Sequence, residues 1–131
     1  MADQSVIGPL VGRRLGGPDS DFAIVEWIDS GESDWEWIAP LHVHHGDDEA
    51  WYVLAGALRV RIGNETFQAG PGGAAFAPKG TPHAYGNARR EPVRYLLVTT
   101  PKLLALVDAL HAPGAGDYAA IFRAHDSELL S

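Results

Sequence analysis

Three histidines and one glutamate occur in this chain with the types and spacing that metal ligands need. His42, His44 and Glu49 lie close together in the sequence, and His83 follows after a long interval. Three neutral imidazoles and one carboxylate suit a borderline transition ion, namely Fe, Mn, Ni, Cu, Co or Zn. Calcium and magnesium fit this donor set poorly, because both prefer oxygen ligands. The residue types therefore predict one divalent transition metal ion as a cofactor.

A strand and the turn after it would bring the first three of these residues together. The segment 35–44 is expected to be extended, and side chains on a strand return to the same face every second residue. His42 and His44 would thus project from one face, roughly 6.5 to 7 Å apart along it. The segment 46–48 has turn composition, with two aspartates that we expect to be solvated. Glu49 would then start a returning strand, where a hairpin brings it beside the two histidines.

His83 would reach the same site from a later part of the chain. The segment 78–82 is rich in Pro and Gly and predicts a turn, and Pro82 favours an extended approach to the next strand. His83 would enter that strand at its end. Four protein ligands would leave an octahedral ion two positions for water, dioxygen or a substrate. His45 has the wrong parity to join the set unless its strand bulges.

The residues from His42 to Asn87 resemble the two sequence motifs of the cupin superfamily. The first motif ends at Gly56 and the second begins at Gly72, with fifteen residues between them, as in small microbial cupins. The resemblance is to a small single-domain conserved-barrel cupin of the quercetin dioxygenase-like kind, and it implies the same four ligands. One departure is Glu36, which stands where the first motif usually opens with Gly.

Many short strands with turn signals between them predict an all-β fold. The residues 58–62 alternate strictly between apolar and basic side chains, and the residues 22–28 form an apolar run of strand length. Together with the resemblance, this pattern predicts a cupin-type antiparallel β-barrel (a double-stranded β-helix, or jelly roll) over about residues 22–100, with a C-terminal helical segment over 101–131. A chain of 131 residues fits one domain over 1–131.

Helices are predicted only after the barrel. Thr100 is a suitable N-cap, with Pro101 at the first helical position and an apolar stripe behind it. A second helix is expected after Asp117, with apolar residues at helical spacing as far as Leu129. Near the N-terminus, the residues 10–15 suggest an edge strand.

Composition excludes several classes of function. With 10 basic and 17 acidic residues, the net charge of -7 argues against nucleic acid or an anionic membrane as a partner. The chain has no cysteine, which excludes zinc-thiolate sites, thiol nucleophiles and disulfides. The N-terminus lacks a signal-peptide pattern, and the apolar runs are too short to span a bilayer. We expect a soluble cytoplasmic protein.

Some neighbours of the predicted ligands are candidates for contact with a substrate. Tyr85 and Asn87 have the same strand parity as His83, so both would face the ion. Trp51 has the parity of Glu49 but is more typical of the barrel core. Tyr85 is the better candidate for touching a substrate, because a buried hydroxyl needs a partner. If the chemistry needs an acid or base besides the metal, Tyr85 and Glu49 are the catalytic candidates, Glu49 only if it leaves the metal.

The resemblance implies a metal-dependent dioxygenase acting on a small oxygen-rich organic substrate as the first function. A non-redox isomerase, cyclase or lyase, with the ion as a Lewis acid, is the second. A non-catalytic small-molecule-binding cupin is the third, because one fold hosts many functions.

Both faces of the strand at 22–28 are apolar, and cupins pair through such sheets, so we expect a homodimer.

Overall fold

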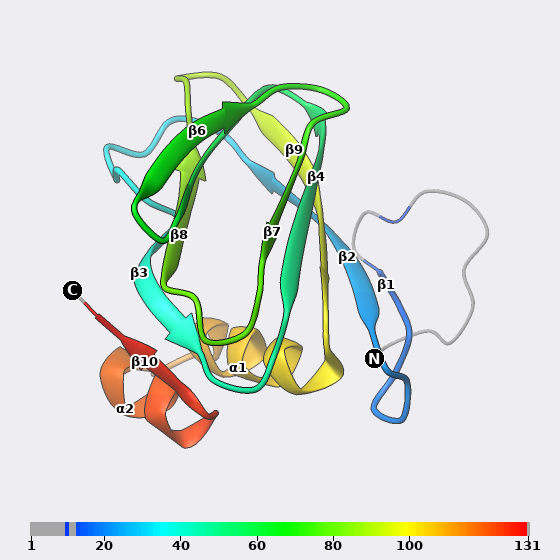
Figure 1. Cartoon of the computed structure of the whole chain (residues 1–131), viewed down its shortest axis with the longest axis vertical. Coiled ribbons are helices and arrows are strands. Elements are labelled where there is room, and N and C mark those ends of the chain that lie inside the picture. Colours follow the sequence, from blue (N-terminus) through cyan, green and yellow to red (C-terminus); the bar gives the residue numbers. More distant parts are fainter. Residues whose placement is uncertain (1–9, 11–12, 131) are drawn as a thin grey trace.

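Figure 1 shows the computed structural model, which describes residue 10 and residues 13–130. Strands dominate, and the two helices come after the ninth of them. In chain order the elements are β1 (Arg14–Leu15), β2 (Ala23–Asp29), β3 (Ala39–His44), β4 (Glu49–Ala55), β5 (Leu58–Ile62), β6 (Glu65–Ala69), β7 (Ala74–Ala77), β8 (His83–Asn87), β9 (Val93–Thr99), α1 (Pro101–His111), α2 (Tyr118–Ala124) and β10 (Ser127–Leu129).

The strands form two antiparallel sheets of five strands each, which face one another (Figure 1). One sheet has the order β1-β2-β9-β4-β7 and the other the order β10-β3-β8-β5-β6. This is the double-stranded β-helix that the sequence predicts. The apolar core draws its buried side chains from strands of both sheets, so it lies between their inner faces.

Side-chain alternation explains why these segments are strands. In β5, Leu58 and Val60 are completely buried, whereas the arginines between and after them are partly exposed. In β4, Trp51 and Val53 are each 1% exposed, while Tyr52 between them is 42% exposed. A period of two places one face of each strand in the core and leaves the other face outside.

The first helix begins where the sequence predicts it. The side chain of Thr100 accepts a hydrogen bond from the backbone N–H of Leu103, and Pro101 occupies the first helical turn. Leu104 packs against the core cluster, and α1 lies across the lower end of the barrel in Figure 1. No helix within residues 13–130 is long and apolar enough to cross a membrane.

The C-terminal segment differs from the sequence-based prediction. The expected second helix ends at Ala124, and Leu129 lies in strand β10 instead of on the helix. Asp126 adopts a positive φ of 56°, which turns the chain back so that β10 pairs with β3. The helical spacing of apolar residues was therefore misleading here, because the residues after Ala124 pair with the edge of the sheet at β3 instead of continuing the helix.

Two further boundaries were also placed incorrectly. The strand that carries the first histidines begins only at Ala39, so the residues 35–38 are not strand. The expected edge strand at 10–15 is present as Arg14–Leu15, and residues 11–12 lie outside the described residues.

Candidate metal centre

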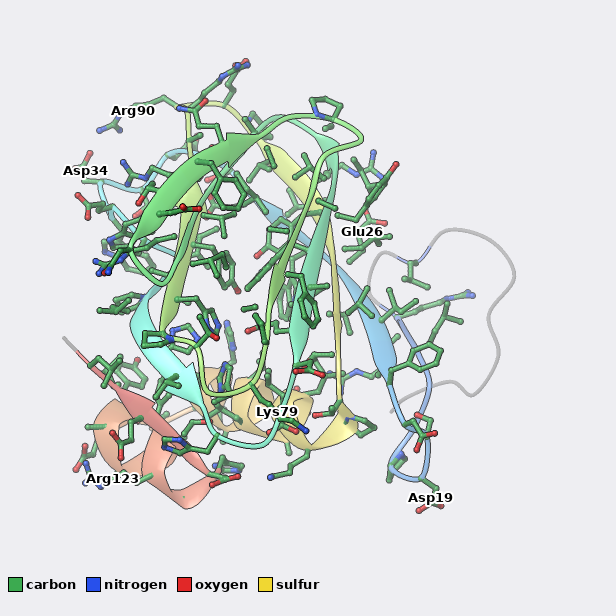
Figure 2. All side chains as sticks on the ribbon, in the orientation of Figure 1. Asp19, Glu26, Asp34, Lys79, Arg90 and Arg123 are labelled. Atoms are coloured by element: carbon green, nitrogen blue, oxygen red, sulfur yellow. The ribbon has the colours of Figure 1, made fainter. Side chains whose placement is uncertain are left out.

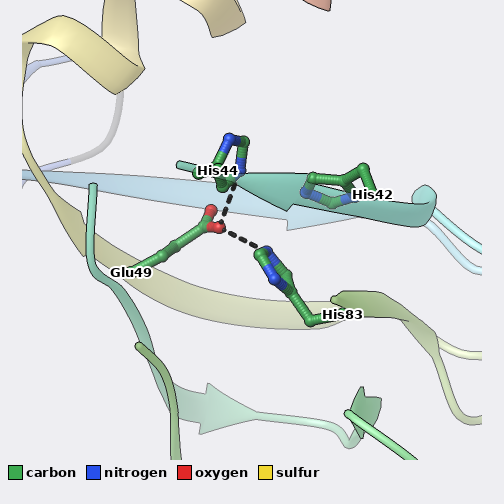
Figure 3. Close-up of side chains that lie close together, drawn as sticks. All are labelled: His42, His44, Glu49 and His83. Atoms are coloured by element: carbon green, nitrogen blue, oxygen red, sulfur yellow. Dashed lines mark hydrogen bonds and ion pairs between the residues drawn. The ribbon is translucent and has the colours of Figure 1, made fainter. Parts of the chain in front are cut away.

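The four predicted ligands lie together inside the barrel. His42 and His44 come from β3, His83 from β8 and Glu49 from the start of β4. Figure 3 shows their side chains pointing toward one another, and one nitrogen or oxygen atom from each lies within 4.8 Å of those of the others. His83 is 1% exposed and each of the other three is 3% exposed. The structure thus brings the predicted residues into one buried cluster.

The cluster bridges the two sheets. Strands β3 and β8 are neighbours in one sheet, where His42 lies directly opposite His83. Glu49 belongs to the facing sheet, where it pairs with Ala77 of β7. The expectation that a hairpin brings Glu49 beside the histidines is therefore wrong in detail. The turn after β3 crosses between the sheets, and Glu49 approaches from across the barrel.

Backbone carbonyls orient two of the imidazoles. The Nδ1 atom of His42 lies 2.6 Å from the carbonyl oxygen of Pro40, and that of His83 lies 2.9 Å from the carbonyl oxygen of Thr81. A carbonyl oxygen only accepts hydrogen bonds, so each Nδ1 carries the hydrogen and donates it. In the neutral ring, Nε2 is then the atom with the free lone pair.

A side chain orients the third imidazole in the same way. The Nδ1 atom of His44 lies 2.7 Å from the hydroxyl oxygen of Ser127. Ser127 donates its own hydrogen to the carbonyl oxygen of His125 at 3.1 Å. The hydroxyl therefore accepts from His44, and the lone pair of His44 is also at Nε2. Metal-ligating histidines usually have their second ring nitrogen engaged like this.

These orientations fit a bound cation. Nε2 of His83 lies 2.9 Å from Oε1 of Glu49, and Nε2 of His44 lies 3.4 Å from the same oxygen. A nitrogen lone pair that faces a carboxylate oxygen is repelled unless a proton or a metal ion lies between them. Three imidazole nitrogens and one carboxylate oxygen form a donor set that suits a divalent transition ion.

The ionisation states in the cluster also suit metal binding. Burial, reinforced by His83 and His44, lowers the pKa of His42 to about 3. Burial by itself would raise the pKa of Glu49, but close polar contacts with His44 and His83 outweigh it and lower that pKa to about 2. Metal ligands must be deprotonated. At neutral pH His42 is thus a neutral imidazole and Glu49 a carboxylate.

Two aromatic core residues, Trp51 and Tyr85, lie next to the cluster. The ring of Trp51 lies 5.6 Å from that of His83 and 5.1 Å from that of Tyr85, centroid to centroid. Burial, together with the charge of Glu49, raises the pKa of Tyr85. The indole Nε1 of Trp51 is buried and has no hydrogen-bond acceptor in the described part of the chain. Trp51 was expected to be a core residue, and its strand parity gives no sign of this unpaired donor.

Asn87 does not reach the His–Glu cluster, although its strand parity suggested that it would. Its side-chain amide donates to Asp29 at 3.0 Å and to the carbonyl oxygen of Glu91 at 2.8 Å. Asn87 and Arg90 line a cavity of about 340 Å³. Figure 2 shows Arg90 at the upper end of the barrel, away from Lys79 at the lower end, where β8 begins.

Two residues that are close to the ligands in the sequence lie outside the cluster: His45 is exposed and Asp47 is buried. His45 is exposed and lies outside the cluster, 3.7 Å from Glu128, as its parity predicts. Asp47 was expected to be solvated but is only 4% exposed. It accepts a hydrogen bond of 2.6 Å from the hydroxyl of Thr100. This contact joins the turn before Glu49 to the start of α1.

Comparison with known proteins identifies the family. A family model described as "Cupin domain" matches residues 35–99, a stretch that contains all four residues of the cluster. The chain belongs to the cupin family. The resemblance inferred from the two motifs is therefore confirmed, and so is the fold that it implied.

Individual proteins of known structure resemble the chain over part of its length. The structure of TT1209 from Thermus thermophilus is 34% identical, covering 62% of this chain and 73% of that chain with a TM-score of 0.53. A sugar phosphate isomerase of the cupin superfamily, SPO2919 from Silicibacter pomeroyi, is 25% identical, covering 62% of this chain and 51% of that chain with a TM-score of 0.53.

A third relative is known from its sequence. Protein MJ1618 of Methanocaldococcus jannaschii is 31% identical over 61 residues, which are 47% of this chain and 49% of the relative. The chain thus matches about half the length of this relative.

Proposed function

We propose that this cupin is a metal-dependent enzyme in which one divalent transition ion activates a small, oxygen-rich organic substrate. One observation carries the proposal: His42, His44 and His83 each have Nδ1 engaged by an acceptor, and all three lie with a buried carboxylate in one cluster. Four protein ligands leave an octahedral ion two open positions, whereas a zinc ion, which four ligands would close as a tetrahedral site, would accept a substrate by expanding to five-coordination. A bound ion with open positions would polarise a carbonyl or hydroxyl oxygen, and a redox-active ion would also support reaction with dioxygen.

The pKa values assign roles to the protein's own groups. Glu49, with its pKa lowered to about 2, is a weak base and is better suited to hold the ion than to take a proton. Tyr85, with its pKa raised by burial, keeps its hydroxyl hydrogen at neutral pH and would donate it to a substrate oxygen. The indole N–H of Trp51 is a second donor that lacks an acceptor among the described residues. This donor-rich interior favours a substrate with carbonyl, enol or carboxylate oxygens.

We place a non-redox reaction first, most simply a proton shift next to a carbonyl group. Such an isomerisation needs no oxidant, and a cupin 25% identical to this chain is named a sugar phosphate isomerase. The dioxygenase expected from the sequence resemblance is the second candidate. The observation in its favour is the imidazole-rich donor set, which suits Fe, Cu and Ni.

One experiment separates these functions. Protein purified from minimal medium is analysed for metals, then loaded in parallel with zinc or iron and incubated with sugar phosphates, β-diketones and a flavonol. Deuterium uptake from heavy water, followed by NMR, reports the proton shift, and an oxygen electrode reports dioxygen use. We expect one ion per chain and deuterium uptake with zinc under nitrogen. Turnover that requires both iron and dioxygen would instead establish the dioxygenase. Tight binding of one compound without either signal would indicate a binding protein.

The role of Tyr85 is tested in the same assay. Tyr85→Phe should keep the metal content of the wild type and lower kcat/KM by about 100-fold, the usual effect of removing one donor to a reacting oxygen. Tyr52→Phe is the matched control, because Tyr52 is 42% exposed on the outer side of β4. An unchanged kcat/KM in Tyr85→Phe would remove this residue from the mechanism.

A further inference from the structure

The last residues of the chain fold back onto the strand that carries two of the ligands. Helix α2 and strand β10 follow the stretch matched by the cupin family model. Strand β10 pairs antiparallel with β3, so that Ser127 lies opposite His44 and Leu129 opposite His42. Figure 1 shows α2 and β10 beside the lower end of β3. We refer to residues 118–130 as the C-terminal clasp.

The clasp contacts two ligands through side chains. Ser127 is 1% exposed and its hydroxyl accepts the hydrogen of His44 Nδ1 at 2.7 Å. Phe122 of α2 is 4% exposed, and its ring lies edge-on to that of His42 with centroids 5.4 Å apart. His42 and His83 instead use carbonyl oxygens two positions away in the sequence. The orientation of His44 therefore depends on a residue 83 positions away.

Polar contacts at the rim hold the clasp in place. Lys102 of α1 lies 3.2 Å from Asp126 and 3.7 Å from Asp47. The backbone N–H of His45 donates to the carbonyl oxygen of Asp126 at 3.0 Å, and that of Leu130 donates to the carbonyl oxygen of Leu41 at 2.9 Å. Exposed ion pairs contribute only about 0–1 kcal/mol each. Because β10 lies at the edge of its sheet, we expect the clasp to open at a lower free energy than the barrel.

We propose that the C-terminal clasp controls how tightly the ion is held, with Ser127 as the positioning residue for His44. When the clasp is docked, the ring of His44 presents Nε2 to the cluster and Phe122 covers His42. When it is undocked, His44 loses its acceptor and the site opens. Coupling between metal binding and clasp docking is reciprocal. If docking raises the affinity for the metal by some factor, metal binding must raise the equilibrium constant for docking by the same factor.

The first test compares metal affinities of three variants, with nickel as the probe and a colorimetric chelator as competitor. Ser127→Ala should weaken binding about 10–100-fold, the typical effect of losing the partner of a metal-bound histidine. Ser127→Thr, which keeps the hydroxyl, should restore most of this loss. Glu128→Ala is the control, because Glu128 lies in the same strand but its side chain is 56% exposed. The visible spectrum of the cobalt-loaded protein should shift in Ser127→Ala and stay unchanged in Glu128→Ala.

The second test uses the wild-type chain and needs no variant to fold. Hydrogen exchange read by mass spectrometry should show slower exchange of residues 118–130 with nickel than without it. The clasp proposal rests on the proposed metal site, and different results would contradict each of them. Wild-type protein that binds no metal would overturn both. Normal nickel affinity in Ser127→Ala, or unchanged exchange of the clasp on metal binding, would overturn the clasp and leave the metal site standing.

Discussion

At the scale of single residues, the position of a histidine in its strand decides whether it can serve as a ligand. His44 and His45 are adjacent in the sequence, yet the side chain of His44 is 3% exposed inside the cluster and that of His45 is 46% exposed outside it. Successive side chains on a strand point to opposite faces. This pair therefore offers a matched test of the metal site.

Replacing His44 with Gln should abolish stoichiometric metal binding, whereas replacing His45 with Gln should leave it intact. Loss of a direct ligand should weaken affinity by more than the roughly 10–100-fold that follows loss of a ligand's hydrogen-bond partner. Metal content after dialysis, with the affinity from chelator competition, is the measurement. Full stoichiometry in His44→Gln would contradict the assignment.

The metal-free protein should lose stability in acid, and His42 should account for the first part of the loss. Its pKa is lowered from 6.5 to about 3 in the folded chain, so between these values the unfolded chain binds more protons. The free energy of unfolding should therefore fall as the pH falls from 6.5, by up to about 1.4 kcal/mol per pH unit. Glu49, with its pKa lowered from 4.5 to about 2, adds to the loss below pH 4.5.

Urea unfolding of metal-free protein at pH values between 7 and 4.5 measures this dependence. His42→Gln removes the titrating group, so its stability should change less with pH over the same range. Identical slopes for His42→Gln and the wild type would show that another group is responsible.

At the scale of elements, glycine turns set the spacing between the strands of the site. Gly56, between β4 and β5, has a φ of +77°, and a Cβ atom there would collide with the carbonyl oxygen of Pro92. Gly80, in the turn before His83, has a φ of +81° but open space around it. A substitution at either glycine would strain the backbone, because both have a positive φ. Only at Gly56 would the new Cβ atom also collide with a neighbouring atom.

Gly56→Ala should therefore destabilise the protein more than Gly80→Ala. A left-handed conformation costs a residue with a Cβ atom about 1–2 kcal/mol, and overpacking adds about 1–3 kcal/mol. We expect only the first cost at Gly80 and both costs at Gly56. Chemical unfolding of the metal-free variants measures the difference. Equal losses would mean that the chain near Pro92 moves aside without cost.

At the scale of the whole molecule, the outer face of the β1-β2-β9-β4-β7 sheet carries a row of apolar side chains that are partly or largely exposed among the described residues. Ile24, Val98, Ala50 and Phe76 lie side by side across four strands of this face. The large side chains most exposed on or beside it include Phe22 at 61%, Phe76 at 55% and Ile28 at 53%. Contiguous apolar surface of this kind marks interaction sites.

We propose that two copies of the chain pair through this sheet. Phe76→Glu should convert the dimer to a monomer, because two carboxylates would be buried in the symmetric contact. Phe67→Glu is the control, because Phe67 is 39% exposed on β6 of the other sheet. Light scattering coupled to gel filtration gives the mass. A monomeric wild type at micromolar concentration would remove the proposal, and a monomeric Phe67→Glu would move the interface to the other sheet.

The sequence by itself determined the barrel and the four residues of the buried His–Glu cluster. Strand parity, turn composition and the two motifs are local patterns, so His42, His44, Glu49 and His83 could be assigned without coordinates. The start of α1 at Thr100 is equally local, because capping depends on adjacent residues.

Only the tertiary structure decided what surrounds that cluster. The pairing of β10 with β3, the hydrogen bond from His44 to Ser127 and the contact of Phe122 with His42 join residues far apart in the chain. The placement of Glu49 in the facing sheet and the unpaired Trp51 N–H also depend on how the sheets pack. No local periodicity encodes such contacts, because they arise where segments meet after the chain has folded.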